Sequence, residues 1–456
     1  MLRAGLALAL LAVLALGASP ADAAGGRIRL VKDIRPGIAP STPTELTDVN
    51  GALLFVADDG ANGAELWKSN GTTAGTRLLK DVNPGAGAAS SPHELVNVNG
   101  TLFFVADNGV HGNELWKSNG TTAGTRLLKD IMPGAASSWP RDLTNVGGTL
   151  YFVADNGANG LELWKSNGTT AGTKLVKDIS ARFGYGPREL TAVGGALFFR
   201  YEGQGASDWL LGGLWRSDGT TAGTVQVSLE IVPYGLAAVG KTLFFSATPG
   251  DGSYWLGRSD GTSLGTVLLK DFLWDAPREL TDRDGVLYFF AYDNAHMHSG
   301  LWRSDGTAAG TTQVAPLIQS DPDLPFPPHH LTNVNGTLFF VAPFVWNGGL
   351  KYSLWKSDGT NAVMVKDVWP THDRVQLRDL TNVNGLLYFF NDDWPIAIDL
   401  FVSDGTAAGT VQLRRYFSYP AGETPPHGPV NVGGIVYYAA SDGVTGRELW
   451  EITRPE

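Results

Sequence analysis

A motif of eight residues returns along this chain in nine copies, and this repetition constrains the fold more than any other feature. The first copy, Glu65–Thr72, reads ELWKSNGT, and close copies follow at Glu114–Thr121 and Glu162–Thr169. The tryptophan positions are 67, 116, 164, 215, 257, 302, 355, 401 and 450, with glycine at 257 and phenylalanine at 401. A spacing of about 48 residues is typical of an array built from one supersecondary unit.

Each unit contains four short stretches with the pattern of β-strands. In the first unit they are residues 45–49, 52–57, 65–69 and 77–82. Asn50-Gly51 separates the first two stretches and favours a two-residue hairpin, because both turn residues need positive φ. The second stretch, Ala52–Ala57, is apolar without alternation, as expected for a strand covered on both faces. The repeat therefore predicts a four-stranded antiparallel sheet.

The two ends of the chain supply complementary parts of one further unit. Residues 27–34 match the fourth strand, and residues 430–452 match the first three. Pairing of Ile28–Ile34 with Glu448–Ile452 would cover both open edges, so we predict a closed β-propeller of about nine four-stranded blades. Because propellers usually have about four to eight blades, eight blades with a displaced unit stay open, as does a linear solenoid.

The first 23 residues have the features of a secretory signal peptide. Arg3 precedes the apolar run Leu6–Leu16, and Ala21 and Ala23 supply small residues at a cleavage site. We expect residues 24–456 to form a single domain outside the cytoplasm, extracellular or periplasmic, with an uncleaved anchor as the alternative. The later sequence has no apolar run long enough to span a membrane, and no cysteine for disulfides. A net charge of −11 argues against nucleic acid as a partner.

The motif, with the following Gly-Thr and strands such as LVKDI, resembles that of the ELWxxDGT-repeat proteins, which are secreted bacterial proteins. The resemblance covers Arg27–Glu456, although asparagine replaces the motif aspartate at Asn70, Asn119 and Asn167. It implies the repeat architecture and secretion. The family has no general activity that could be carried over to this chain.

The motif residues themselves are predicted to be structural. The turn after the third strand contains serine, aspartate or asparagine, and glycine, which are suited to a staple of hydrogen bonds that holds the turn. The motif tryptophans are suited to packing between blades. No cofactor or metal is expected. The alternatives are calcium bound by the loop 58–63, a metal bound by His296 and His298 with His329 and His330, or cations bound at the motif aspartates: Asp218, Asp260, Asp305, Asp358 and Asp404.

Residues outside the repeat pattern concentrate on one side of the predicted ring. Seven tryptophans fall in connections from fourth to first strands (139, 274, 369) or from second to third strands (209, 255, 346, 394), and these connections share one face. Acidic residues recur where the innermost strand starts, and His330 replaces them once. The predicted ligand-binding residues are Trp139, Trp209, Trp255, Trp274, Trp346, Trp369, Trp394, Glu189, Glu279 and His330. The alternative is that these connections are merely longer and more variable.

These features favour a secreted binding protein with a carbohydrate or protein ligand. No catalytic residue is assigned in that interpretation. A carbohydrate-active hydrolase or lyase is the second interpretation, with Glu189 and Glu279 and with Asp321 or Asp323 as carboxylates at the channel mouth. A structural coat or matrix protein is the third.

Overall fold

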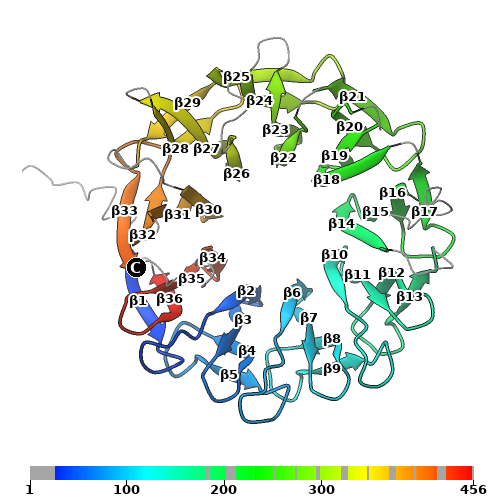
Figure 1. Cartoon of the computed structure of the whole chain (residues 1–456), viewed down its shortest axis with the longest axis vertical. Helices are drawn as coiled ribbons and strands as arrows, with labels where there is room; N and C mark the ends of the chain where they lie inside the picture. The colour runs from blue at the N-terminus through cyan, green and yellow to red at the C-terminus, as the bar shows by residue number, and fades with distance from the viewer. Residues whose placement is uncertain are drawn as a thin grey trace, which may run out of the picture.

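The computed structural model contains nine four-stranded antiparallel sheets arranged in a ring (Figure 1). It describes residues 26–179, 185–201, 212–229, 231–249, 252–272, 275–293, 298–319, 327–346, 349–368, 376–393, 397–417 and 428–453. The predicted signal peptide lies outside these residues. The described residues contain no helix, and so none that could span a bilayer.

Each blade runs from an innermost strand near the ring axis to an outermost strand at the periphery (Figure 1). The innermost strands are β2 (Thr44–Val49), β6 (His93–Val98), β10 (Arg141–Val146), β14 (Pro187–Val193), β18 (Val232–Val239), β22 (Arg278–Arg283), β26 (His329–Val334), β30 (Gln376–Val383) and β34 (Val430–Val432). The second strands are β3 (Ala52–Asp58), β7 (Thr101–Asp107), β11 (Thr149–Asp155), β15 (Ala196–Tyr201), β19 (Thr242–Thr248), β23 (Val286–Asp293), β27 (Thr337–Trp346), β31 (Leu386–Asp393) and β35 (Ile435–Ser441).

The third strands carry the motif, and the fourth strands form the outer edge of each blade. The third strands are β4 (Ala64–Ser69), β8 (Asn113–Ser118), β12 (Leu161–Ser166), β16 (Gly213–Ser217), β20 (Trp255–Ser259), β24 (His298–Ser304), β28 (Gly349–Ser357), β32 (Ala397–Ser403) and β36 (Arg447–Thr453). The fourth strands are β5 (Arg77–Lys80), β9 (Arg126–Lys129), β13 (Lys174–Lys177), β17 (Val225–Ser228), β21 (Val267–Asp271), β25 (Thr312–Gln319), β29 (Ala362–Lys366), β33 (Val411–Phe417) and β1 (Arg27–Lys32). Blades one to eight follow chain order from β2 to β33.

Blade nine closes the ring in the predicted way. Strand β1 pairs antiparallel with β36, with Ile28 opposite Ile452 and Leu30 opposite Trp450. The Arg29 Nε donates to the buried Glu451 Oε1 at 2.5 Å across this pair. The first and last strands therefore form one blade, and the ring has nine blades rather than eight.

The core lies between neighbouring blades. The motif tryptophans Trp67, Trp116 and Trp164 are only 4–5% exposed. Trp116 of blade two packs in one cluster with Leu54 and Leu66 of blade one, so the prediction of inter-blade packing is confirmed. The hairpin prediction is also confirmed at Asn50 and Gly51, whose φ angles are 55° and 79°.

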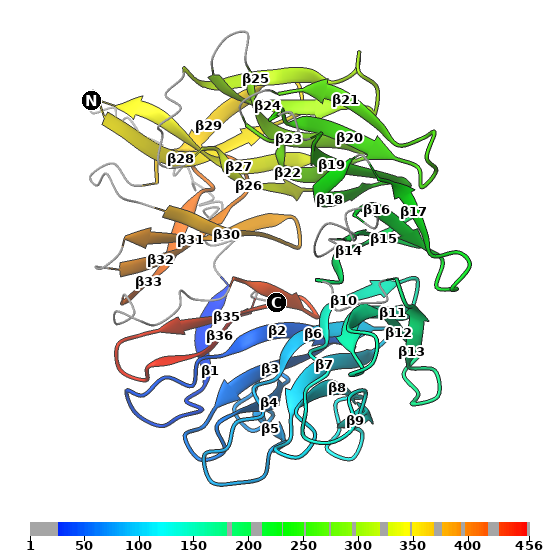
Figure 2. The ribbon, with the colours of Figure 1, turned by 45° about the vertical axis from the view of Figure 1, so that its right-hand side comes forward.

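The antiparallel strand order determines which connections share a face. Those from second to third strands, and from fourth strands to the next blade, lie together on what we call the loop face. The hairpins and the motif turns lie on the opposite turn face (Figure 2).

Candidate functional site

The acids at the start of the innermost strands have a common backbone conformation. Their φ angles are 54–56°, and His330 in blade seven has a φ of 61°. These inner-strand acids are Glu45, Glu94, Asp142, Glu189, Glu279 and Asp379. At each of them the pairing with the second strand shifts register, as in a β-bulge, so the side chain leaves the sheet.

Four of these acids tie one blade to the next. Glu45 Oε2 accepts from the Leu95 N–H at 3.1 Å, and Glu94 Oε2 accepts from the Leu143 N–H at 3.1 Å. Glu189 and Glu279 accept in the same way from the N–H groups of Leu236 and Leu331, at 3.3 and 2.6 Å. The inner ring of acids thus has a structural task that sequence analysis missed.

Glu189 and Glu279, two carboxylates of the hydrolase interpretation, do not lie in adjacent blades. Glu189 belongs to blade four and Glu279 to blade six, with the whole of blade five between them. Glu189 is moreover in an ion pair with Arg200 at 2.9 Å. A glycosidase pair needs carboxyl groups about 5–9.5 Å apart on either side of one bond. Asp321 and Asp323 lie outside the described residues.

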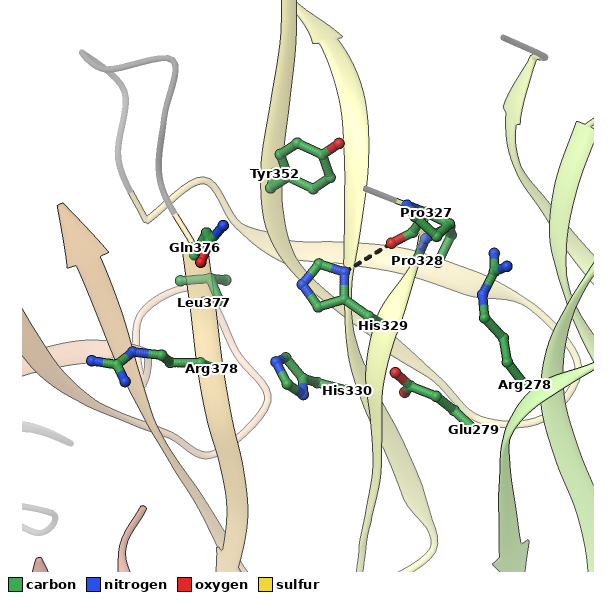
Figure 3. A pocket seen from close by; sticks show the side chains of 10 residues that line it. All are labelled: Arg278, Glu279, Pro327, Pro328, His329, His330, Tyr352, Gln376, Leu377 and Arg378. Atoms are coloured by element: carbon green, nitrogen blue, oxygen red, sulfur yellow. Dashed lines mark hydrogen bonds between the residues drawn. The ribbon is translucent and has the colours of Figure 1, made fainter. Parts of the chain in front are cut away.

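A pocket of about 390 Å³ opens on the loop face at the inner ends of blades six, seven and eight (Figure 3). It is lined by Arg278, Glu279, Pro327, Pro328, His329, His330, Tyr352, Gln376, Leu377 and Arg378. Two predicted ligand residues, Glu279 and His330, are therefore brought together. Figure 3 shows both on one side of His329, with Tyr352 on the other.

Aromatic rings form one wall of this pocket. The His329 and His330 rings lie 4.8 Å apart, edge to face, and the Tyr352 ring lies 6.2 Å from His329. His329 Nδ1 lies 2.8 Å from the Pro327 carbonyl oxygen, which orients the ring (Figure 3). Burial, with the nearby His329, lowers the pKa of His330, although Glu279 and Asp379 oppose this shift. His330 is therefore a neutral hydrogen-bonding group at neutral pH.

Arg278 stands between this pocket and a second cavity of about 490 Å³ between blades five and six. Tyr234, Asp275 and Glu279 also line the second cavity. Arg278 Nη1 donates to Asp275 Oδ2, and burial raises the pKa of Tyr234 to about 12. Arg278 and Glu279 thus line both cavities, and each cavity also has an aromatic side chain in its lining.

Three of the seven predicted tryptophans belong to the described residues, and they lie in different blades or connections. Trp139 is 61% exposed on the loop face. Trp255 lies in strand β20 rather than in a loop, and its Nε1 donates to Ser253 Oγ at 2.9 Å. Trp346 is the last residue of strand β27, again not in a loop. Trp209, Trp274, Trp369 and Trp394 lie outside the described residues.

Sequence analysis gave no role to Arg278 or Tyr352. A signal for Arg278 existed, because it directly precedes an inner-strand acid and other blades repeat this basic-acidic pair. Tyr352 had no such signal, since it reaches the pocket through the extension of strand β28 to nine residues.

The motif turn forms the predicted staple. In blade one Ser69 Oγ and Thr76 Oγ1 lie 2.7 Å apart, Gly71 N–H donates to Ser69 Oγ, and Asn70 Oδ1 accepts from Thr72. In later blades an aspartate stands at the position of Asn70 and makes the same hydrogen bonds to threonine. In blade seven these hydrogen bonds lower the pKa of Asp358 to about 2. In the loop 58–63 the Asp59 Oδ1 accepts from the Ala61 and Asn62 N–H groups. His296 lies outside the described residues, which contain no group of three or more histidines and acids suited to a metal.

The glutamate of the motif has a role that sequence analysis missed. Glu65 is fully buried and accepts from Val82 N–H at 2.9 Å, from Ser90 N–H at 2.8 Å and from Ser90 Oγ at 2.6 Å. Glu114 binds Ile131 and Ser138 in the same way. This glutamate ties down the connection to the next blade. Burial raises the pKa of both carboxyl groups.

No family model matches this chain, and no curated protein matches it in sequence. Among solved structures it is similar to a prolyl endopeptidase, with a TM-score of 0.47 and 11% identity over 92% of this chain and 55% of that one. It is also similar to oligopeptidase B from Leishmania major, with a TM-score of 0.47 and 9% identity over 89% of this chain and 53% of that one. An uncharacterized protein from Listeria monocytogenes matches with a TM-score of 0.40 and 11% identity over 87% of this chain and 99% of that one. The chain spans about half the length of these two peptidases, and the likeness carries no conclusion about activity.

Proposed function

We propose that this protein is a secreted binding protein that holds a saccharide in the pocket on the loop face. The observation that carries the proposal is the wall formed by Tyr352 and His329 beside the polar groups of Arg278 and Glu279. Sugar rings stack on aromatic faces, and their hydroxyls need donors and acceptors placed next to those faces.

Each lining group has a task in binding. Tyr352 and His329 supply ring surface for stacking. Arg278 supplies donors, and the neutral His330 supplies one donor and one acceptor for sugar hydroxyls. Glu279 is held by the Leu331 N–H, so its position does not depend on the ligand.

The hydrogen bonds of Glu189 and Glu279 favour a binding function over a hydrolytic one. Glu189 and Glu279 accept backbone N–H groups of different blades, and a whole blade separates them. Neither is therefore paired with the other across one bond.

A polysaccharide panel with residues 24–456 tests the proposal. We expect retention of at least one saccharide, with affinity lowered at least tenfold by Tyr352→Ala and unchanged by Leu264→Ala. Leu264 is the matched control, because it is 95% exposed on the turn face. No retained saccharide, or equal affinity of both variants, would contradict the proposal. Release of reducing sugar by the intact protein would replace it with the hydrolase.

A further inference from the structure

One position of the innermost strand carries a basic side chain in most blades. It directly precedes the inner-strand acid or His330, and the basic residues at it are His93, Arg141, Arg188, Arg278, His329 and Arg378. Thr44 and Tyr234 occupy it in blades one and five. Because blades one to eight present this position at the same end of the innermost strand, these residues lie around the axis on the loop face. The four arginines of this basic ring lie beside the inner-strand acids, and Arg141, Arg278 and Arg378 form ion pairs with aspartates, so a ligand carboxylate would compete with these pairs.

The basic ring meets exposed aromatic rings at blades three and four. Trp139 and Tyr185 are 61% and 48% exposed. Arg141 Nη2 donates to the Tyr185 carbonyl oxygen at 2.9 Å, and the Arg188 guanidinium lies 5.6 Å from the Tyr185 ring centre. Two aromatic faces and two guanidinium groups thus share one segment of the rim.

Trp139 has an unfavourable backbone conformation and an exposed side chain. Its φ is 50°, in the left-handed region, where the equivalent residues of neighbouring blades are Thr42 and Ser91 with φ of 49° and 46°. A bulky residue in this region is strained, and a largely exposed tryptophan loses the gain of burial. Packing therefore does not account for Trp139, whereas contact with a ligand does.

Arg278 offers the same chemistry at blades five to eight. Its Nη1 is bound to Asp275, and its Nε and Nη2 have no acceptor in the described part of the chain. In Arg415 the same two atoms bind Asp399 Oδ1 and Oδ2 at 2.9 and 3.0 Å, the geometry of a side-on carboxylate pair. The free edge of Arg278 matches a carboxylate in that geometry. Because both donors are shielded from solvent, a ligand would reach them by rotation of this side chain, which is 25% exposed.

We propose that the basic ring binds an acidic polysaccharide, a polymer of uronate sugars. Its carboxylates pair with the arginines of the ring, and its sugar rings stack on Trp139, Tyr185 and Tyr352. A polymer fits better than a single sugar, because the two aromatic-arginine sites lie on different blades of one ring. This inference rests on the proposed function and names the ligand class of that site.

Polygalacturonate and its fully methyl-esterified form are the matched probes, because esterification removes the charges and keeps the sugar rings. We expect the acidic polymer to bind at least tenfold more tightly at low salt. The advantage should shrink as salt rises from about 50 to 500 mM, because exposed charges are screened.

Variants place the ligand on the ring. We expect Arg188→Gln and Arg278→Gln each to weaken binding of polygalacturonate at least fivefold, with no change for Arg77→Gln on the outer strand β5. Trp139→Ser installs the residue of blade two at position 91, so it should keep the melting temperature and still weaken binding. This variant keeps the test valid where loss of an arginine perturbs folding.

The outcomes separate the two proposals. Equal binding of the acidic and esterified polymers would overturn the acidic ligand and leave the saccharide-binding function standing. Poly-glutamate bound as tightly as polygalacturonate would overturn the saccharide in favour of an acidic peptide. Full binding by the Trp139 and arginine variants would overturn the ring as the site, and no saccharide binding at all would overturn both proposals.

Discussion

Blades one to three and blades six to eight are built from the same repeat but use one position differently. In the first region the residue before the motif leucine is a buried glutamate, namely Glu65, Glu114 or Glu162. In the second region the same position holds Gly300, Ser353 or Asp399. Glu65 and Glu114 bind the connection to the next blade, whereas Asp399 binds Gln412 and Arg415 of its own blade.

The pocket lies in the region without the glutamate tie. There the strands extend, with 8 residues in β25, 10 in β27 and 9 in β28, against 4 in β5, 7 in β3 and 6 in β4. The extension brings Tyr352 to the cavity. The irregular blades keep their place because neighbouring blades hold them from both sides in the ring.

Deletion of residues 27–34 should have the largest effect, because it tests whether both regions depend on one closed ring. The deletion exposes the edge of β36 and removes the Arg29 partner of the buried Glu451. We expect the melting temperature to fall by roughly 10 °C or more. Removal of residues 24–26 alone is the control, and equal melting of the two proteins would refute closure through β1.

Replacement of two tryptophans in blades one to three should change the unfolding free energy by very different amounts. Trp116→Ala empties a buried inter-blade site and should cost about 3–5 kcal/mol of unfolding free energy. Trp139→Ala removes an exposed ring and should change it by less than about 0.5 kcal/mol. Chemical denaturation measures both. Similar losses would mean that Trp139 is a packing residue and would remove it from the ligand face.

The glutamate position itself can be compared between the regions. Glu114→Gln replaces one accepting oxygen by an amide NH₂ group, so buried N–H and O–H donors lose an acceptor. We expect the unfolding free energy to fall by about 2–4 kcal/mol. Ser353→Ala should cost less than about 1 kcal/mol, because the buried Ser353 Oγ has no partner in the described residues. Equilibrium unfolding of the two variants measures both losses of unfolding free energy. A larger loss for Ser353→Ala would reverse the assignment of roles.

The smallest effect, counted per pH unit, concerns the equivalent glutamate of blade nine. Burial raises the pKa of Glu448 from 4.5 to about 7. Between these values the folded state binds the proton more tightly, so the unfolding free energy should fall as pH rises, by at most about 1.4 kcal/mol per pH unit. Glu448→Gln should flatten this slope in unfolding curves recorded from pH 4.5 to 8. An unchanged slope would show that other groups cause it.

Sequence analysis was most successful where the repeat carries the information. The four-stranded unit, the hairpin at Asn50-Gly51 and the burial of Trp116 all follow from patterns within about 50 residues. The glutamate tie also left a partial signal, because Glu65 and Glu114 are followed by Ser90 and Ser138, whereas Tyr185 takes this position after Glu162. That signal needed a comparison of the repeats with one another rather than a search for motifs.

The site could be predicted only in part. Glu279 and His330 were expected on one face, and the structure places both in one pocket. The partner of Glu279 could not be expected, because Glu279 accepts from the Leu331 N–H across a blade boundary. Contacts of this kind join residues about 50 positions apart, and a pattern within one unit does not contain them.

The amino-acid sequence alone determined the repeat, the four-strand unit and the buried face of each blade. These depend on hydrophobic periodicity and turn chemistry, which are local properties of the chain. Only the tertiary structure decided which polar side chains are bound to the backbone within the fold and which line a cavity. Glu65 and Arg278 are both charged residues in repeated positions, yet the first is buried on backbone N–H groups and the second keeps an unpaired edge beside a cavity. That difference arises from the spacing and tilt of neighbouring blades, because these set which donor meets which acceptor.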